Sequence, residues 1–214
     1  MSIEGVYLVA GLRFHRSIPS FIEAVEQAFL GGVRLFQLRV KDDLSDKEHL
    51  ELSLRVRELA YKYHVTYILN DRPDLAMQSH ADGVHLGPDD MSVQEARSII
   101  GDKIIGKSSH SYAQAQKALE EKISYLSVGP VFETDCKEVP DHVVGIDLLT
   151  QILLQAQGLP IVAIGGIELN NLYQIAQTGV GCFGLIRGIM QAENIHEEAE
   201  KYVHEFGRLQ KDLK

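Results

Sequence analysis

The sequence predicts one compact (β/α)₈ TIM barrel domain that spans residues 1–214. Eight short apolar runs alternate with longer stretches of helical period, which is the pattern of repeated βα units. Most runs are apolar at successive positions, as expected for parallel strands buried on both faces. A doubly wound open sheet is the competing architecture, and its first strand should lead into a G-x-G-x-x-G phosphate loop. The segment that contains the first run, VYLVAGLRFHRS, has no such loop, which disfavours that sheet. The barrel is favoured, although such barrels typically need ~250 residues.

The eight predicted strands are short and rich in residues that favour extended structure. They are VYLVA from Val6, LFQLR from Leu35, TYILN from Thr66, GVHLG from Gly83, IIGKS from Ile104, YLSVG from Tyr125, PIVAIG from Pro160 and CFGLI from Cys182.

Helical signals fill the segments between these runs. Ile18, Phe21, Ile22, Val25 and Phe29 form one apolar stripe at helical spacing. SDKE at 45–48 and SVQE at 92–95 are capping boxes, which predict the starts of the second and fourth helices. Glycines at 31–32, 158 and 179 predict where helices end before the next strand. The segment after the proline at position 73 predicts only a short third helix.

Composition excludes several classes of protein. A net charge of -9 argues against a nucleic-acid or anionic-membrane surface, because clustered Lys and Arg hold such partners. Cys136 and Cys182 lie far apart without CxxC spacing, so neither a disulfide scaffold nor a structural zinc site is expected. No signal peptide and no apolar stretch of ~20 residues is found, which predicts a cytoplasmic protein. The oligomeric state stays open, a homo-oligomer included.

Polar residues follow the second, third and fourth strands, at the end where such barrels carry their active sites. Alternation places Gln37, Arg39 and Lys41 on one side, where two cations and an amide suit a diphosphate. Asp71 and Asp90 follow the next two strands, and carboxylates facing a diphosphate usually hold Mg²⁺. Plainer interpretations are a solvated strand end for the cations, a turn for Asp71 and a helix start for Asp90.

The fifth strand ends in hydroxyl and imidazole side chains. Ser108 can bind a ligand or cap a helix, and Ser111 is the better capping candidate. His110 could act as an acid or base, but a lone loop histidine is more often structural. His85, inside the fourth strand, is interpreted as a hydrogen-bonded core residue.

The last three strands open into a long loop and two glycine-containing turns. The loop after the sixth strand is a candidate lid, in which Lys137 could reach a phosphate and Cys136 could be reactive or merely a small filler. Backbone N–H groups at Gly165-Gly166 and at Ile186-Arg187 match the usual phosphate site after strands seven and eight. The sequence therefore predicts two separate anion sites.

Five segments carry a family resemblance: QLRVK (37–41), ILNDRPDLAMQSHADGVHLGPDD (68–90), GKSSHS (106–111), GPVFETDCK (129–137) and VAIGGI (162–167). They resemble QLREK, IxNDRxDxAxxxxADGVHLGQxD, GxSxHS, GPxxxTxTK and VAIGGI of the thiamine phosphate synthases and the similar TenI-type thiazole tautomerases. The resemblance runs from VYLV to about His204, and the 68–90 block is its most specific part.

The resemblance implies a transferase that joins hydroxymethylpyrimidine diphosphate to thiazole phosphate and releases pyrophosphate. In that family diphosphate leaves first to give a pyrimidine cation, which the thiazole nitrogen attacks. The implied cofactor is Mg²⁺, held by Asp71 and Asp90. The implied substrate-binding set is Gln37, Arg39, Lys41, Asn70, Ser108, Thr134, Cys136, Lys137, Gly165, Gly166, Ile186 and Arg187, of which Arg39, Lys41, Ser108 and Lys137 serve the chemical step.

Departures from the synthase pattern leave two alternatives. Cys136 replaces a Thr, Arg187 stands where Ser is common, and residues 138–142 lack the usual Arg. FETDCK is similar to the tautomerase branch, so a thiazole tautomerase is one alternative. Pro130 stands where those tautomerases carry His, and the diphosphate set is retained, which favours the synthase. The other alternative is a non-catalytic regulatory or ligand-binding barrel of the TenI type.

Overall fold

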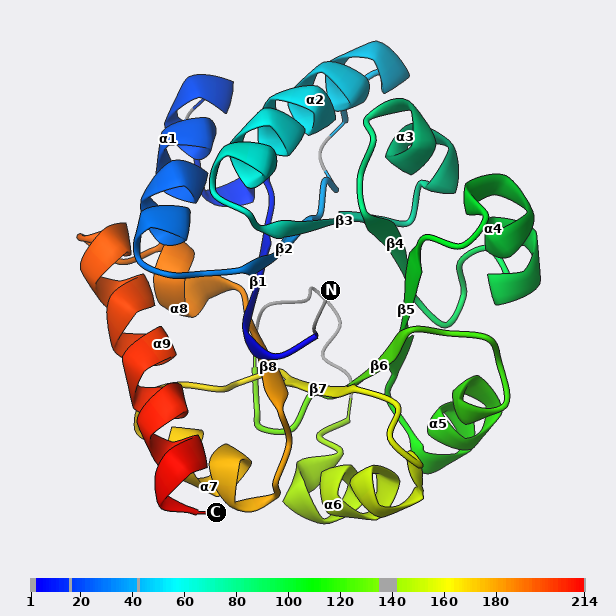
Figure 1. Cartoon of the computed structure of the whole chain (residues 1–214), viewed down its shortest axis with the longest axis vertical. Helices are drawn as coiled ribbons and strands as arrows, with labels where there is room; N and C mark the ends of the chain where they lie inside the picture. Colours follow the sequence, from blue (N-terminus) through cyan, green and yellow to red (C-terminus); the bar gives the residue numbers. More distant parts are fainter. Residues whose placement is uncertain (1–2, 16, 42, 135–141, 214) are drawn as a thin grey trace.

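Eight parallel strands close into a barrel in chain order, and the helices surround it (Figure 1). The computed structural model describes residues 3–15, 17–41, 43–134 and 142–213. The strands are β1 Gly5–Ala10, β2 Leu35–Leu38, β3 Thr66–Asn70, β4 Gly83–Leu86, β5 Ile104–Ser109, β6 Tyr125–Val128, β7 Ile161–Ile164 and β8 Cys182–Leu185. Each overlaps the run predicted for it, so the predicted (β/α)₈ barrel is confirmed.

Helices follow the strands around the outside of the barrel. They are α1 Ile18–Leu30, α2 Asp46–Lys62, α3 Pro73–Gln78, α4 Val93–Ile100, α5 Tyr112–Leu119, α6 Gly145–Gln155, α7 Leu172–Gln177, α8 Arg187–Met190 and α9 Ile195–Asp212, with a 3-10 turn, η1, at Leu12–Phe14. Ser45 and Ser92 close the two predicted capping boxes, and Ser111 caps α5 as expected. Neither η1 nor α8 was predicted, because three or four residues carry no readable period.

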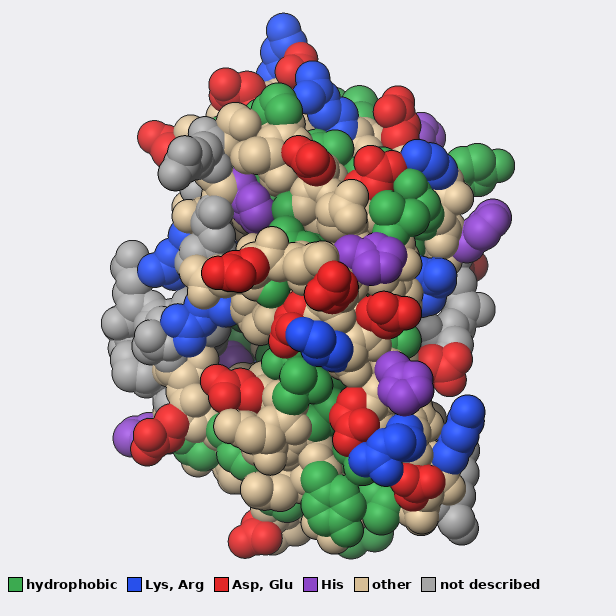
Figure 2. Space-filling view, turned by 90° about the vertical axis from the view of Figure 1, so that its left-hand side faces the viewer, with side chains coloured by type: hydrophobic (Ala, Val, Ile, Leu, Met, Phe, Trp, Pro, Cys, Tyr) green, Lys and Arg blue, Asp and Glu red, His purple; other side chains and the backbone are tan. Residues whose placement is uncertain are grey.

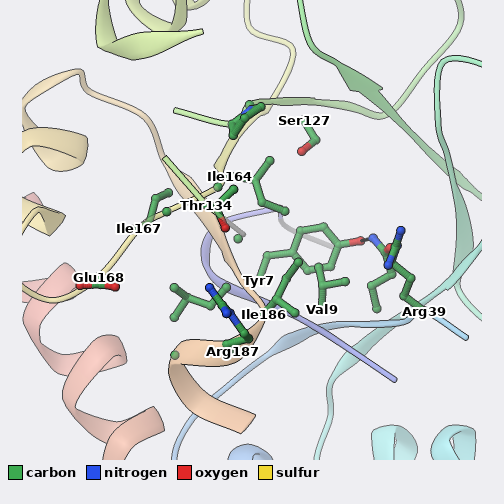
Figure 3. A pocket seen from close by; sticks show the side chains of 18 of the residues that line it. Tyr7, Val9, Arg39, Ser127, Thr134, Ile164, Ile167, Glu168, Ile186 and Arg187 are labelled. Atoms are coloured by element: carbon green, nitrogen blue, oxygen red, sulfur yellow. Dashed lines mark hydrogen bonds between the residues drawn. The ribbon is translucent and has the colours of Figure 1, made fainter. Parts of the chain in front are cut away.

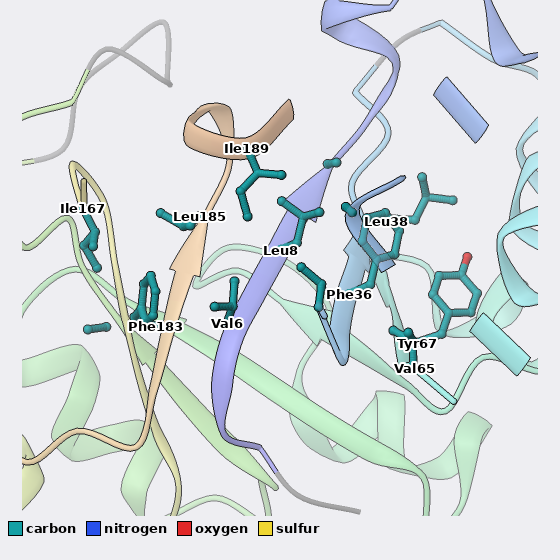
Figure 4. Packing of buried hydrophobic residues seen from close by; sticks show 14 of the residues in the cluster. Val6, Leu8, Phe36, Leu38, Val65, Tyr67, Ile167, Phe183, Leu185 and Ile189 are labelled. Atoms are coloured by element: carbon teal, nitrogen blue, oxygen red, sulfur yellow. The ribbon is translucent and has the colours of Figure 1, made fainter. Parts of the chain in front are cut away.

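Alternation along each strand divides the core into two layers. Val6 and Leu8 of β1 face the surrounding helices and pack with Phe36 and Phe183 (Figure 4). The buried part of the predicted α1 stripe, which is Phe21, Val25 and Phe29, joins this outer layer. The inner layer fills the barrel itself and consists of Tyr7, Val9, Leu35, Ile68, Tyr125, Val162 and Cys182.

The inner layer depends on a glycine in β5. A Cβ at Gly106 would overlap the fully buried ring of Tyr125 on β6. We expect Gly106→Ala to lower the free energy of unfolding by about 1–3 kcal/mol, because a buried ring cannot move away without disturbing its neighbours. Thermal unfolding measures the effect, with Gly181→Ala as control, since a Cβ at Gly181 meets nothing within 4 Å. Equal melting temperatures for the two variants would contradict this packing.

The outer surface mixes both signs of charge. Figure 2 shows acidic and basic side chains interspersed on one face of the molecule, with no broad single-sign area among the described side chains of that face. No helix in the described part of the chain combines the length and apolar character needed to cross a membrane.

Candidate active site

A cavity of about 640 Å³ opens at the carboxyl ends of the strands. All eight strands or the loops that follow them contribute to its wall, because parallel strands in a barrel end at one rim. Figure 3 shows side chains from opposite sides of the barrel facing this space, among them Arg39, Thr134 and Arg187. Of the residues predicted from sequence, these line it: Gln37, Arg39, Asn70, Ser108, Thr134, Gly165, Gly166, Ile186 and Arg187.

Two cationic residues follow β2: Arg39 lines the cavity, and Lys41 lies beside it. Gln37 and Arg39 both line the cavity, as their two-residue spacing predicts. Lys41 does not line it, but its Nζ lies 2.5 Å from Oδ2 of Asp71 at the end of β3. The lysine side chain is 54% exposed and the aspartate 21%, so the ion pair contributes little to stability and stays accessible to a ligand.

Asp71 and Asp90 lie together beside the cavity. Burial and a hydrogen bond with Asp90 raise the pKa of Asp71. Burial works to raise the pKa of Asp90 too, but hydrogen bonds from Asp71 and from the Gly87 amide, together with the charges of Lys41 and Lys107, outweigh it and lower that pKa. Two carboxylates this close share a proton unless a cation separates them.

This carboxylate pair fits a divalent cation that is shared with a substrate. No group of three or more His, Cys, Asp or Glu side chains within residues 3–15, 17–41, 43–134 and 142–213 could hold a metal by itself. Mg²⁺ commonly takes only one or two carboxylates and fills its remaining positions with phosphate oxygens and water. Asp71 and Asp90 are therefore a donor set suited to Mg²⁺ bound together with a phosphorylated ligand.

On the opposite side of the cavity, the backbone of the two glycines after β7 packs against the loop that follows β6. Gly165 and Gly166 have φ of +98° and +65°, which side-chain-bearing residues rarely adopt. A Cβ on Gly165 would lie 2.5 Å from Cα of Pro130, and one on Gly166 would lie 2.7 Å from Cβ of Phe132. The loop after β6 thus packs directly on the two glycines, and hydrogen bonds from Val131 and Phe132 to the end of β7 hold it there.

Several lining residues were not predicted to reach the cavity. Tyr7, Val9 and Ser127 point inward from β1 and β6. His85 is buried with a partner on each ring nitrogen, as expected of a core histidine, yet it also lines the cavity. His110, for which an acid or base role and a structural role were both considered, lines it too, with Nδ1 2.6 Å from the Gly129 carbonyl oxygen. Alternation could have found the inward positions once the inner face of one strand was known.

Two predicted residues lie outside the described part of the chain. Cys136 and Lys137 fall within 135–141, whereas Thr134, immediately before them, lines the cavity. On the α8 side the wall also contains three carboxylates that were not predicted, those of Glu168, Glu193 and Glu198.

Comparison with known proteins shows which family the chain resembles. The sequence family described as thiamine monophosphate synthase matches residues 6–189. Thiamine-phosphate synthase 1 of Streptococcus pneumoniae (strain ATCC BAA-255 / R6) is 41% identical over 178 residues, which cover 81% of this chain and 84% of that protein. Thiamine-phosphate synthase of Bacillus velezensis is 34% identical over 205 residues, covering 95% and 91%. The solved structure of thiamine phosphate pyrophosphorylase from Pyrococcus furiosus superposes with a TM-score of 0.87 at 31% identity, covering 96% of each chain.

Proposed function

Because the chain belongs to the thiamine monophosphate synthase family and is a transferase, we propose that it joins hydroxymethylpyrimidine diphosphate to thiazole phosphate and releases pyrophosphate. The single observation that supports this reaction best is the shared cavity. Gln37 and Arg39, at the end suited to a diphosphate, and backbone suited to a second phosphate line the same 640 Å³ cavity, and Lys41, Asp71 and Asp90 lie beside it. Two fixed anchors can align two reactants, which is a large part of the rate enhancement for a bimolecular reaction.

The diphosphate half of the proposal uses the ends of β2, β3 and β4. Arg39 would bind the diphosphate bidentately, and Lys41, which is paired with Asp71, would add a mobile second cation. Asp71 and Asp90 would hold Mg²⁺, which supplies positive charge to the departing pyrophosphate when bound. Gln37 and Asn70 are buried and line the cavity, where they would contact the pyrimidine.

The other half uses the ends of β7 and β8. The amides at Gly165, Gly166 and Ile186-Arg187, with the hydroxyl of Thr134, would hold the thiazole phosphate. Ser108 lies between the two halves on β5 and would contact the pyrimidine near the reacting carbon. No side-chain nucleophile is required, since the departure of pyrophosphate creates the electrophile and the thiazole nitrogen supplies the electron pair.

Incubation of the protein with Mg²⁺ and both phosphorylated precursors tests the proposal. We expect thiamine phosphate and pyrophosphate in equal amounts, and loss of both when EDTA removes the metal. Isomerisation of a thiazole alone would instead identify a tautomerase. Binding of either precursor without any reaction would identify a ligand-binding barrel, and turnover that survives EDTA would contradict the metal assignment.

Arg187 provides a specific prediction for the second phosphate. It is the first residue of α8, two positions after the end of β8, and it lines the cavity where the family commonly has Ser. If it contacts the phosphate, Arg187→Ser should raise KM for thiazole phosphate by about tenfold, since a charge-assisted hydrogen bond contributes roughly 1.5–3 kcal/mol before solvent screening. KM for the pyrimidine diphosphate should change little.

Steady-state kinetics with each substrate varied in turn measure this effect. Arg55→Ser is the matched control, because Arg55 is exposed on α2 and does not line the cavity. A lower KM for thiazole phosphate in Arg187→Ser would show that the arginine obstructs the site.

A further inference from the structure

A chain of hydrogen bonds crosses the barrel beneath the cavity and joins side chains from five strands. Gln37 Nε2 on β2 donates to the Tyr7 hydroxyl on β1 at 2.7 Å. The Tyr7 and Tyr125 hydroxyls lie 2.7 Å apart, and the Tyr125 hydroxyl is 2.8 Å from Nδ1 of His85 on β4. His85 Nε2 is in turn 2.8 Å from Oγ of Ser108 on β5. Gln37 and Ser108, the two ends, both line the cavity.

Each middle member of this chain carries one hydrogen atom to share. Tyr7 and Tyr125 are at most 1% exposed, and burial raises the pKa of both phenols, so both stay protonated. His85 is buried and its two ring nitrogens each face a hydroxyl oxygen rather than a carboxylate, so its imidazole is neutral with one N–H. A buried hydroxyl that accepts from one neighbour satisfies its own hydrogen only by donating to the next group, so the direction of one contact fixes the direction of those that follow.

The Gln37 amide sets that direction. Because its N–H occupies one side of the Tyr7 oxygen, Tyr7 must donate to Tyr125, which then donates to Nδ1 of His85. His85 therefore carries its hydrogen on Nε2 and donates to Ser108. If Tyr125 donated to Tyr7 instead, the Tyr7 oxygen would accept from both Gln37 and Tyr125. Its own buried hydrogen would then have no acceptor among the described residues, which is unfavourable. Figure 3 shows the Tyr7 hydroxyl turned toward the Arg39 side of the cavity.

We propose that Tyr7, Tyr125 and His85 act as positioning residues that make Ser108 an acceptor from His85 and so direct the Ser108 hydroxyl hydrogen into the cavity. The Gln37 oxygen, at the other end, remains an acceptor. The cavity floor then offers one donor and one acceptor, which suits an aromatic ring that bears an amino group beside a ring nitrogen. This choice of ligand rests on the proposed function, whereas the direction of the chain does not.

The direction can be measured directly by NMR on the ligand-free protein labelled with ¹⁵N-histidine. We expect a pyridine-type ¹⁵N signal from Nδ1 of His85 and a pyrrole-type signal from Nε2, assigned by their loss in His85→Gln. The reversed pattern, a mixture of the two forms or a charged ring would overturn the proposal. Because no substrate is present, this result stands or falls separately from the reaction.

The effect of this hydrogen-bond chain on substrate binding is tested by tyrosine-to-phenylalanine variants, which remove a hydroxyl but keep the aromatic ring. Tyr125→Phe removes the hydroxyl that fixes His85, and we expect KM for the pyrimidine diphosphate to rise about three- to tenfold, the range expected for one net hydrogen bond. Tyr67→Phe is the matched control, because Tyr67 is equally buried but packs in the outer layer. If the two variants lose stability alike and Tyr125→Phe keeps the original KM, the chain has a structural role only and the positioning role is refuted.

Discussion

Asp71→Asn and Asp90→Asn are each expected to lower turnover by about tenfold or more and to raise the Mg²⁺ concentration needed for half-maximal rate, because each removes a negative charge from the metal site. The two carboxylates are hydrogen-bonded to each other and flanked by Lys41. Lys41 forms an ion pair with Asp71, and bound Mg²⁺ would relieve the repulsion that remains between the two carboxylates. Activity measured against Mg²⁺ concentration gives both parameters.

Asparagine is the appropriate replacement at both positions for backbone reasons. Asp71 has a φ of 62°, in the left-handed region that Asn and Asp tolerate better than other side-chain-bearing residues. Asp90 accepts a hydrogen bond from the Gly87 amide at 2.6 Å, which an asparagine oxygen can also accept. We therefore expect both variants to keep the melting temperature of the original protein to within a few degrees, ~0.5 kcal/mol being usual for surface changes.

Asp89→Asn serves as the control, because Asp89 is exposed next to Asp90 but takes no part in the carboxylate pair. It should retain full activity and the original Mg²⁺ dependence. Near-normal turnover in both Asp71→Asn and Asp90→Asn would mean that the pair holds no catalytic metal.

The fold was predictable because its signals are local and repeated. Capping boxes at Ser45 and Ser92 and the stripe containing Phe21 and Val25 depend only on neighbours in sequence, and the structure confirms them. The outward and inward faces of the strands were harder to separate, because parallel strands are apolar on both. Tyr67 and Tyr125 both appear as buried strand aromatics in the sequence, yet one packs outside the barrel and the other inside.

The candidate site was predictable where polar residues interrupt an apolar strand. Gln37 and Arg39 stand out in this way and both line the cavity, whereas Lys41, which alternation assigns to the same side, does not. The connections beneath the cavity could not be predicted, because they join residues up to 118 positions apart through strands that pair only when the barrel closes. His85 illustrates the difference: its burial was expected, but its partners, Tyr125 and Ser108, follow from the register.

Gly166→Ala is expected to weaken the second phosphate site at least as much as Arg187→Ser does. The residue has a φ of +65°, and a new Cβ would overlap the Glu133 carbonyl and lie 2.7 Å from Cβ of Phe132. The loop after β6 would have to move, carrying Thr134 with it. We expect KM for thiazole phosphate to rise by about tenfold or more, since the loss of even one hydrogen bond to a charged phosphate costs roughly 1.5–3 kcal/mol of binding.

A control must distinguish the strain that any side chain causes at a positive φ from damage to the phosphate site. Gly179→Ala provides that comparison, because Gly179 has a φ of +80° but a Cβ there meets nothing within 4 Å. Both variants should lose about 1 kcal/mol or more of stability through the unfavourable φ. Only Gly166→Ala should also lose affinity for thiazole phosphate, measured by calorimetry on the folded protein. If the two variants differ from the original chain in melting temperature alone, and bind thiazole phosphate equally well, the phosphate is held elsewhere and the two-anchor geometry is wrong.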